Sequence, residues 1–118
     1  MERVRGFEVA KGFEQAGINM PVRKTKYSAG YDVEAAEDCV VPAFKAGQAP
    51  TLVKTGIKAY MPEDEYLMLC NRSSNVKAED IEIKKGDSIG QAIFQKFGIV
   101  DNDNAEGARL GGFGSTSK

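Results

Sequence analysis

Two short stretches of the chain are rich in groups that bind phosphate. In the first, Arg72, Ser73 and Ser74 come at the exit of a predicted strand. An arginine presents N–H donors in a plane that matches phosphate oxygens, and the serines add hydroxyl and backbone donors. The stretch predicts a phosphate cradle at the end of a strand, although taken alone the same residues are also typical of a polar loop.

The second stretch is the C-terminal run 107–118, GARLGGFGSTSK. Its glycines allow the backbone to close around a phosphate, and its aromatic ring offers a face on which a base can stack. A disordered terminus is the alternative, but linkers of glycine and serine do not carry arginine and phenylalanine in this way. The residues expected to contact a nucleotide are Arg109, Gly111, Gly112, Phe113, Gly114, Ser115 and Thr116.

Two further polar residues stand within predicted strands. Asp32 lies near a strand start just after Gly30, which allows the backbone to turn; a solvated aspartate at a strand entry is the alternative interpretation. Gln91 alternates with Ile89 and Ile93, so the three share one face of a strand. A buried amide needs hydrogen-bond partners, so we expect Gln91 either to bond to the backbone or to face a ligand.

The composition limits the chemistry. The chain has 118 residues and no histidine, which excludes His-ligated zinc and the Ser–His and Cys–His nucleophile pairs. Acid–base or metal chemistry then falls to Asp and Glu, which suit hard cations such as Mg²⁺. The net charge of −1 and the lack of a long apolar run predict no nucleic-acid or membrane partner. Two distant cysteines, Cys39 and Cys70, and no signal peptide at the start predict buried free thiols in a reducing cytoplasm.

Alternating patterns predict the elements that position these groups. We expect strands within 5–10, 31–43, 51–60, 66–72, 79–83 and 88–100. Strands that recur about every ten residues, with turn residues between them, are typical of an all-β sandwich or barrel. The one weak helix candidate, 11–17, is too short to be stable alone. One β domain over 1–104 and a flexible glycine-rich segment over 105–118 are expected.

In this order and on an all-β chain, the stretches resemble the motifs of the trimeric dUTPases, the deoxyuridine triphosphate nucleotidohydrolases. The family's first motif, Ala-Gly-x-Asp-x-x-Ala, matches 29–35, and its second, Arg-Ser-Ser/Gly, matches 72–74. The fourth, Gly-Asp-x-Ile-x-Gln, matches 86–91. The fifth, Arg followed by Gly-Gly-Phe-Gly-Ser-Thr-Gly, matches 109–116, with Ser117 in place of the last glycine.

The family's third motif has no counterpart in the sequence. In the family it is a β-hairpin that holds the uracil and carries the Asp that activates the attacking water. A hairpin with its flanks needs on the order of 12 to 25 residues, more than the stretch after Ser74 provides. Either the hairpin is deleted or it is unresolved, and the intact flanks favour the second reading, which predicts a chain break between Ser74 and Lys77. The water-activating Asp is assigned to no residue, and Asp80 and Asp87 are expected in turns.

The resemblance implies a distorted β jelly roll of the β-clip type. It implies a homotrimer with active sites between subunits, each closed by a C-terminal lid. The implied reaction is hydrolysis of dUTP to dUMP and pyrophosphate with Mg²⁺ as cofactor, which supplies dUMP and excludes uracil from DNA.

The resemblance also implies a role for each site residue. Asp32 supports the hydrated metal through water, and Gln91 helps to fix the phosphate and water geometry. Residues 72–74 hold the α- and β-phosphates, and Phe113 stacks over uracil. The γ-phosphate is clamped by Arg109, Ser115 and Thr116.

Two alternatives stay open. A dCTP deaminase shares the fold and an Arg-Ser-Ser signature but lacks the Gly-Gly-Phe-Gly-Ser-Thr lid, and turnover of dUTP against dCTP distinguishes the two. A trimeric nucleotide-binding scaffold without catalysis is the other alternative, and it requires a true deletion of the hairpin.

Overall fold

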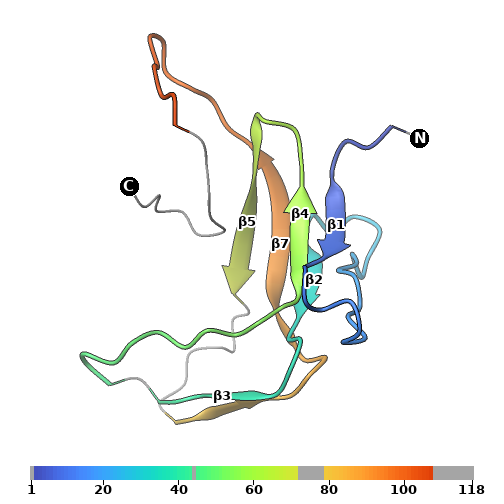
Figure 1. Ribbon diagram of the computed structural model, residues 1–118, viewed down its shortest axis with the longest axis vertical. Helices are drawn as coiled ribbons and strands as arrows, with labels where there is room; N and C mark the ends of the chain where they lie inside the picture. The colour runs from blue at the N-terminus through green and yellow to red at the C-terminus, as the bar shows by residue number, and fades with distance from the viewer. Residues whose placement is uncertain (1, 44, 72–78, 108–118) are drawn as a thin grey trace.

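The chain is all-β in the computed structural model, which describes residues 2–43, 45–71 and 79–107. No helix occurs within those ranges, and residues 11–17 form turns, as their shortness predicted. Within the same ranges, no helix is long and apolar enough to cross a membrane. The strands, drawn in Figure 1, are β1 (Gly6–Val9), β2 (Tyr31–Glu34), β3 (Cys39–Val41), β4 (Ile57–Tyr60), β5 (Glu65–Asn71), β6 (Ile81–Ile83) and β7 (Ser88–Lys96).

The central sheet has three antiparallel strands in the order β2–β7–β5. Its register places Asp32 of β2 opposite Gln91 of β7, and Gln91 opposite Cys70 of β5. Residues paired in this way point to the same face of a sheet, so Asp32, Gln91 and Cys70 form one cross-strand row. Within the described residues β5 pairs with β7 alone, which makes β5 an edge strand.

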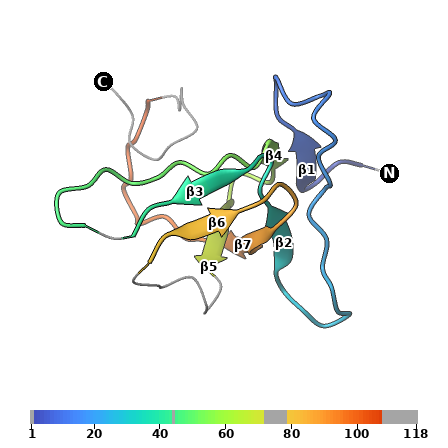
Figure 2. The same ribbon diagram turned by 90° about the horizontal axis from the view of Figure 1, so that it is seen from below.

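Two smaller antiparallel sheets complete the fold, β1 with β4 and β3 with β6. In Figure 1, β1 and β4 run beside the central sheet and β3 lies across its lower end, and Figure 2 shows β3 and β6 side by side. The turn from β6 into β7 forms where it was predicted, at 84–87. Asp87 N donates to the Lys84 oxygen at 2.9 Å, and Gly86 has a φ of 91°.

The hydrophobic core is small. Among the described residues, the buried apolar side chains are Val33, Ala35, Ala36 and Ala92. Aromatic rings join β1 to the central sheet, because the Phe7 ring centroid lies 5.6 Å from that of Tyr31 and 5.3 Å from that of Phe94. By contrast, Leu69 on β5 is 71% exposed and Val100 is 76% exposed. Much apolar surface therefore remains uncovered in the single chain.

Two predicted strands are much shorter than expected, and the one expected within 31–43 is divided into β2 and β3, which belong to different sheets. Within 51–60 only Ile57–Tyr60 is a strand, because Gly56 has a φ of 69°, which interrupts the extended backbone. The last strand ends at Lys96 rather than at residue 100. Lys96 pairs with Glu65, the first residue of β5, so the neighbouring strand offers no further partner.

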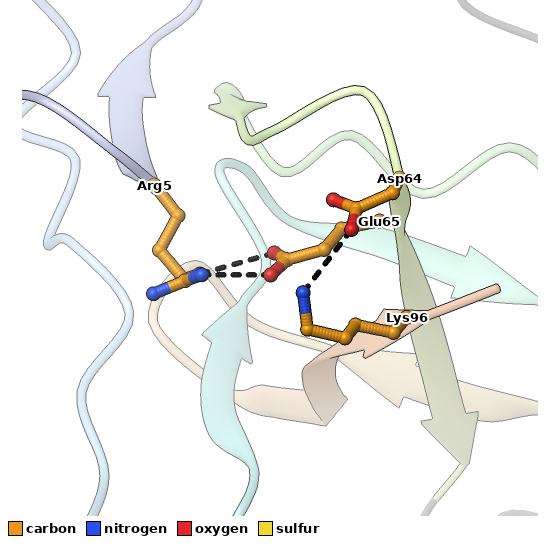
Figure 3. A network of polar contacts seen from close by, with 4 residues as sticks. All are labelled: Arg5, Asp64, Glu65 and Lys96. Atoms are coloured by element: carbon orange, nitrogen blue, oxygen red, sulfur yellow. Dashed lines mark hydrogen bonds and ion pairs between the residues drawn. The ribbon is translucent and has the colours of Figure 1, made fainter.

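A clamp of ion pairs, made by Arg5, Asp64, Glu65 and Lys96, fastens the start of β1 to one end of the central sheet (Figure 3). Arg5 Nε donates to Glu65 Oε1 at 3.0 Å, and Arg5 Nη2 donates to Glu65 Oε2 at 2.7 Å. The Glu65 side chain is 5% exposed, and the hydrogen bonds from Arg5 hold the pKa of its carboxyl below the ordinary value. Lys96 Nζ pairs with Asp64 Oδ2 at 3.1 Å on the surface.

Candidate active site

Asp32 and Gln91, the two predicted catalytic residues, lie side by side on neighbouring strands. Asp32 stands on β2 directly opposite Gln91 on β7. Gln91 Nε2 donates to Asp32 Oδ1 at 3.3 Å, which is long for a hydrogen bond. The Asp32 side chain is 14% exposed and Gln91 is exposed. The carboxylate and the amide therefore form a polar pair that a ligand can reach.

The surroundings of Gln91 differ from the sequence prediction. The prediction placed Gln91 on a buried apolar face with Ile89 and Ile93, bonded to the backbone or facing a ligand. The buried face of β7 is the opposite one, which carries Gly90 and the fully covered Ala92. Alternation separates the two faces of a strand, but it does not say which one packs on the core when both carry apolar residues. Gln91 is exposed and bonds to a side chain.

Gly30 leaves the space that the Gln91 side chain occupies. A Cβ built on Gly30 would lie 2.6 Å from Gln91 Oε1 and 3.0 Å from Gln91 Cβ. Gly30 is absent from the described glycines that have a positive φ, so its backbone conformation does not require glycine. The interpretation of Gly30 as a turn residue is therefore corrected. Glycine fits this position because it has no side chain, and not because the backbone adopts a conformation that only glycine favours.

Lys24, which the sequence prediction missed, reaches the same carboxylate. Lys24 Nζ lies 3.6 Å from Asp32 Oδ2, so each carboxylate oxygen has one partner. No motif marks this lysine. Its position follows from the loop before β2, which folds back so that Val22 forms an antiparallel bridge with Asp32. This bridge brings Lys24, which lies between the two, close to the start of β2.

Asp80 and Asp87 stabilise loops, as predicted. Asp80 Oδ1 accepts from Ala43 N at 2.7 Å, and Asp87 Oδ2 accepts from Lys84 N at 2.8 Å. In the part of the chain that the structure describes, no group of three or more His, Cys, Asp or Glu side chains is placed to hold a metal ion. A cation at this site would have the Asp32 carboxylate as its protein ligand or water partner, which fits Mg²⁺ because that ion keeps several waters.

The other predicted site residues lie outside the described ranges. These are residues 72–74 and the tail segment 109–116, together with the predicted chain break between Ser74 and Lys77. Their roles, and the domain boundary at 105, stay predictions. The phosphate-binding stretch nevertheless begins directly after Asn71, the last residue of β5, and Cys70 of that strand pairs with Gln91.

A groove of about 660 Å³ lies between the central sheet and the β3–β6 sheet. Its lining is mixed, and its apolar residues include Val53, Leu69, Ile81, Ile83 and Ile89. Neither Asp32 nor Gln91 lines it, so the groove is separate from the polar pair. Its lining also includes Asn71, the last residue of β5, so the groove extends between the end of β5 and Ile81 at the start of β6.

Comparison with known proteins links the chain to the dUTPases. A family model described as dUTPase matches residues 16–78. A deoxyuridine 5'-triphosphate nucleotidohydrolase from Lactococcus lactis is 34% identical over 151 residues, covering 97% of this chain and 98% of that protein. The crystal structure of a dUTPase from Streptococcus mutans has a TM-score of 0.69 and 25% identity, and covers 82% of this chain and 99% of that one.

A more distant structure shares the fold. It is a mutant dUTPase from phage phi11 of S. aureus, with a TM-score of 0.63 and 16% identity, covering 89% of this chain and 98% of that one. Its description reports the coordination of a structural Mg(II) ion in that protein.

The Lactococcus alignment also bears on the missing motif. It extends over 151 residues and covers nearly all of both proteins, whereas this chain has 118 residues. The relative therefore contains internal residues that have no counterpart here. The family-model match ends at residue 78, next to the junction where the hairpin was expected.

Proposed function

The chain belongs to the dUTPase family and is an enzyme that hydrolyses dUTP to dUMP, and we propose that Asp32 and Gln91 mark its active site. The observation that carries this proposal is the contact between Gln91 Nε2 and Asp32 Oδ1, which joins residues of the first and fourth motifs across β2 and β7. The two motifs are 59 residues apart in sequence, yet the sheet register sets them directly opposite each other.

In the reaction, a water oxygen bonds to the α-phosphorus while the bond to the bridging oxygen of the β-phosphate breaks, which gives dUMP and pyrophosphate. Gln91 is a neutral donor and acceptor, suited to orient a phosphate oxygen or the attacking water without changing its own charge. Asp32 supplies the negative charge next to it. The water-activating group remains unassigned, since Asp80 and Asp87 are engaged in loops.

We infer that the phosphates are held mainly by the second and fifth motifs. Residues 72–74 follow the end of β5 in the same sheet as Asp32, which supports a role on the α- and β-phosphates. The tail then acts as a lid, with Phe113 stacked on uracil. The γ-phosphate is assigned to Arg109, Ser115 and Thr116.

Mg²⁺ is the proposed cofactor, and its report in the phage relative supports the assignment. When bound, it would neutralise charge on the triphosphate oxygens. Asp32 is the described residue that would hold it through water, and the lack of a larger carboxylate group within the described ranges suits an ion bound largely by water and substrate.

A homotrimer is proposed as the working form. The described part of one chain buries only a few small apolar side chains, while Leu69, Leu52 and Val100 are each more than half exposed. Surfaces of this kind in a soluble enzyme are expected to meet other subunits. Light scattering at micromolar concentration should give three times the mass of one chain, and a monomer mass would contradict the proposal.

The cytoplasm is the proposed location, because both Cys39 and Cys70 are free thiols and such thiols persist in reducing compartments.

The function is tested by incubating the chain with Mg²⁺ and either dUTP or dCTP and measuring pyrophosphate and ammonia. Pyrophosphate from dUTP alone is expected. Ammonia from dCTP would instead identify a deaminase, and no turnover of either nucleotide would contradict the assignment of an enzyme.

A further inference from the structure

The loop that leads into β2 carries three basic side chains with different surroundings. Figure 2 shows this loop projecting beyond the sheets before it enters β2. Arg23 Nη1 donates to the backbone oxygens of Lys26 at 2.7 Å and Ser28 at 3.2 Å, so its guanidinium closes the loop on itself. Lys26 Nζ lies 5.6 Å from the centre of the Tyr27 ring. Only the third, Lys24, is directed at the candidate active site.

The backbone that carries Lys24 is held on both sides. Asp32 N donates to the Val22 oxygen at 2.9 Å, and the Arg23 bonds close the remainder of the loop. The base of the Lys24 side chain is therefore fixed relative to β2. Its long, flexible stem brings Nζ to 3.6 Å from Asp32 Oδ2.

The pair between Lys24 and Asp32 has the features of a contact that exchanges easily. The Lys24 side chain is 69% exposed, and the distance is near the upper limit for an ion pair. Exposed pairs of this kind contribute little to folding stability. The Asp32 carboxylate, 14% exposed and bonded to Gln91, is the fixed partner, and the ammonium is the mobile one.

A nucleoside triphosphate brings several negative charges to a site where Lys24 now faces a single carboxylate. An ammonium is a compact point charge that binds phosphate from many directions. We propose that Lys24 is a further substrate-binding residue: its ammonium pairs with Asp32 in this structure and moves to a non-bridging oxygen of the triphosphate when dUTP binds. This inference rests on the proposed function of the Asp32–Gln91 site.

The test compares Lys24→Met with Lys26→Met, a matched control from the same loop whose ammonium lies over Tyr27 and not beside Asp32. Calorimetry with Mg²⁺ measures the Kd of α,β-imido-dUTP, dUMP and deoxyuridine for each variant. Loss of one charge-assisted contact at an exposed position should weaken α,β-imido-dUTP by about five- to twentyfold. The loss should be smaller for dUMP and absent for deoxyuridine, and Lys24→Arg should retain most of the affinity.

Three results would overturn the proposal by showing that Lys24→Met causes no specific loss of phosphate binding. They are an unchanged Kd for α,β-imido-dUTP in Lys24→Met, an equal loss in Lys26→Met, and an equal loss for deoxyuridine, which would indicate a general structural effect. Tighter binding in Lys24→Met would also overturn it, because Lys24 would then compete with the ligand for Asp32. Failure of the proposed function gives a different result, since the unmodified chain would then neither bind α,β-imido-dUTP nor hydrolyse dUTP.

Discussion

The two charged clusters on this sheet are built differently. In the clamp, Arg5 holds Glu65 with two short hydrogen bonds of 2.7 and 3.0 Å, and the pKa of the Glu65 carboxyl is lowered by them. At the candidate active site, Asp32 has contacts of 3.3 Å to Gln91 and 3.6 Å to Lys24. The Glu65 carboxylate of the clamp therefore has two short hydrogen bonds to Arg5, whereas the Asp32 carboxylate of the candidate site has only long contacts.

This difference indicates what each cluster is for. The bidentate clamp joins segments 60 residues apart and so stabilises the fold. Loose partners around Asp32 leave its carboxylate, the Gln91 amide and the Lys24 ammonium free to exchange for water, cation or phosphate. We therefore expect substitutions at the site to change activity and substitutions in the clamp to change stability.

The largest expected effect is on Asp32. Asp32→Asn keeps the size of the side chain but removes its charge, so kcat/KM for dUTP should fall by about a hundredfold or more. Because its contacts are long, the melting temperature should change little. Pyrophosphate release and thermal melts measure the two quantities. A large fall in melting temperature with kcat/KM retained would show that Asp32, like the clamp, serves stability and not activity.

The next effect concerns the proposed C-terminal lid, where we expect substitutions to change activity rather than stability. Phe113→Ala removes a stacking face worth ~1–3 kcal/mol per base, so kcat/KM should fall roughly ten- to a hundredfold. Arg109→Ala should weaken α,β-imido-dUTP much more than dUMP, because only the former has a γ-phosphate. Equal losses for both ligands would remove the γ-phosphate assignment, and a strong drop in melting temperature for Phe113→Ala would place that ring in the core.

A smaller effect is expected at Gly30. In Gly30→Ala the new Cβ would collide with the Gln91 amide, which must move away from Asp32, so kcat/KM should fall by about tenfold. Gly98→Ala is the matched control, because a Cβ on Gly98 would meet no atom within 4 Å. If both variants behave alike, the fit between Gly30 and Gln91 has no catalytic importance.

The smallest effect on activity is expected in the clamp. Glu65→Gln should lower the melting temperature by a few degrees at neutral pH and leave kcat/KM nearly unchanged. The folded-state pKa of the Glu65 carboxyl is lowered, so the clamp stabilises the folded chain fully at pH above the ordinary carboxyl pKa of about 4.3. That stabilisation is lost as the pH falls through the lower folded-state pKa. The difference from the unmodified chain should therefore vanish in acid. Lys84→Met, which breaks only the exposed pair with Glu82 outside the clamp, is the control.

The sequence predicted the strands better than the surroundings of the candidate site residues. Alternation located β2 and β7, and the resemblance to the family's motifs pointed to Asp32 and Gln91, but nothing in the sequence predicted that these two side chains pair. It could not predict which face of β7 is buried, because Ile89 and Ile93 lie on the face opposite to Ala92. Lys24 was missed because its position depends on how a loop returns to β2, which is a three-dimensional property.

Strand β5 has a consequence for handling the protein. Among the described residues no strand pairs with its outer edge, which lies next to Leu67, Met68 and the 71% exposed Leu69. An apolar edge of this kind is a template on which another chain can add a strand and begin ordered aggregation. Leu69→Lys would place a charge beside that edge, so in chains that have not assembled into the proposed trimer it should raise the concentration at which the protein stays free of β-rich precipitate.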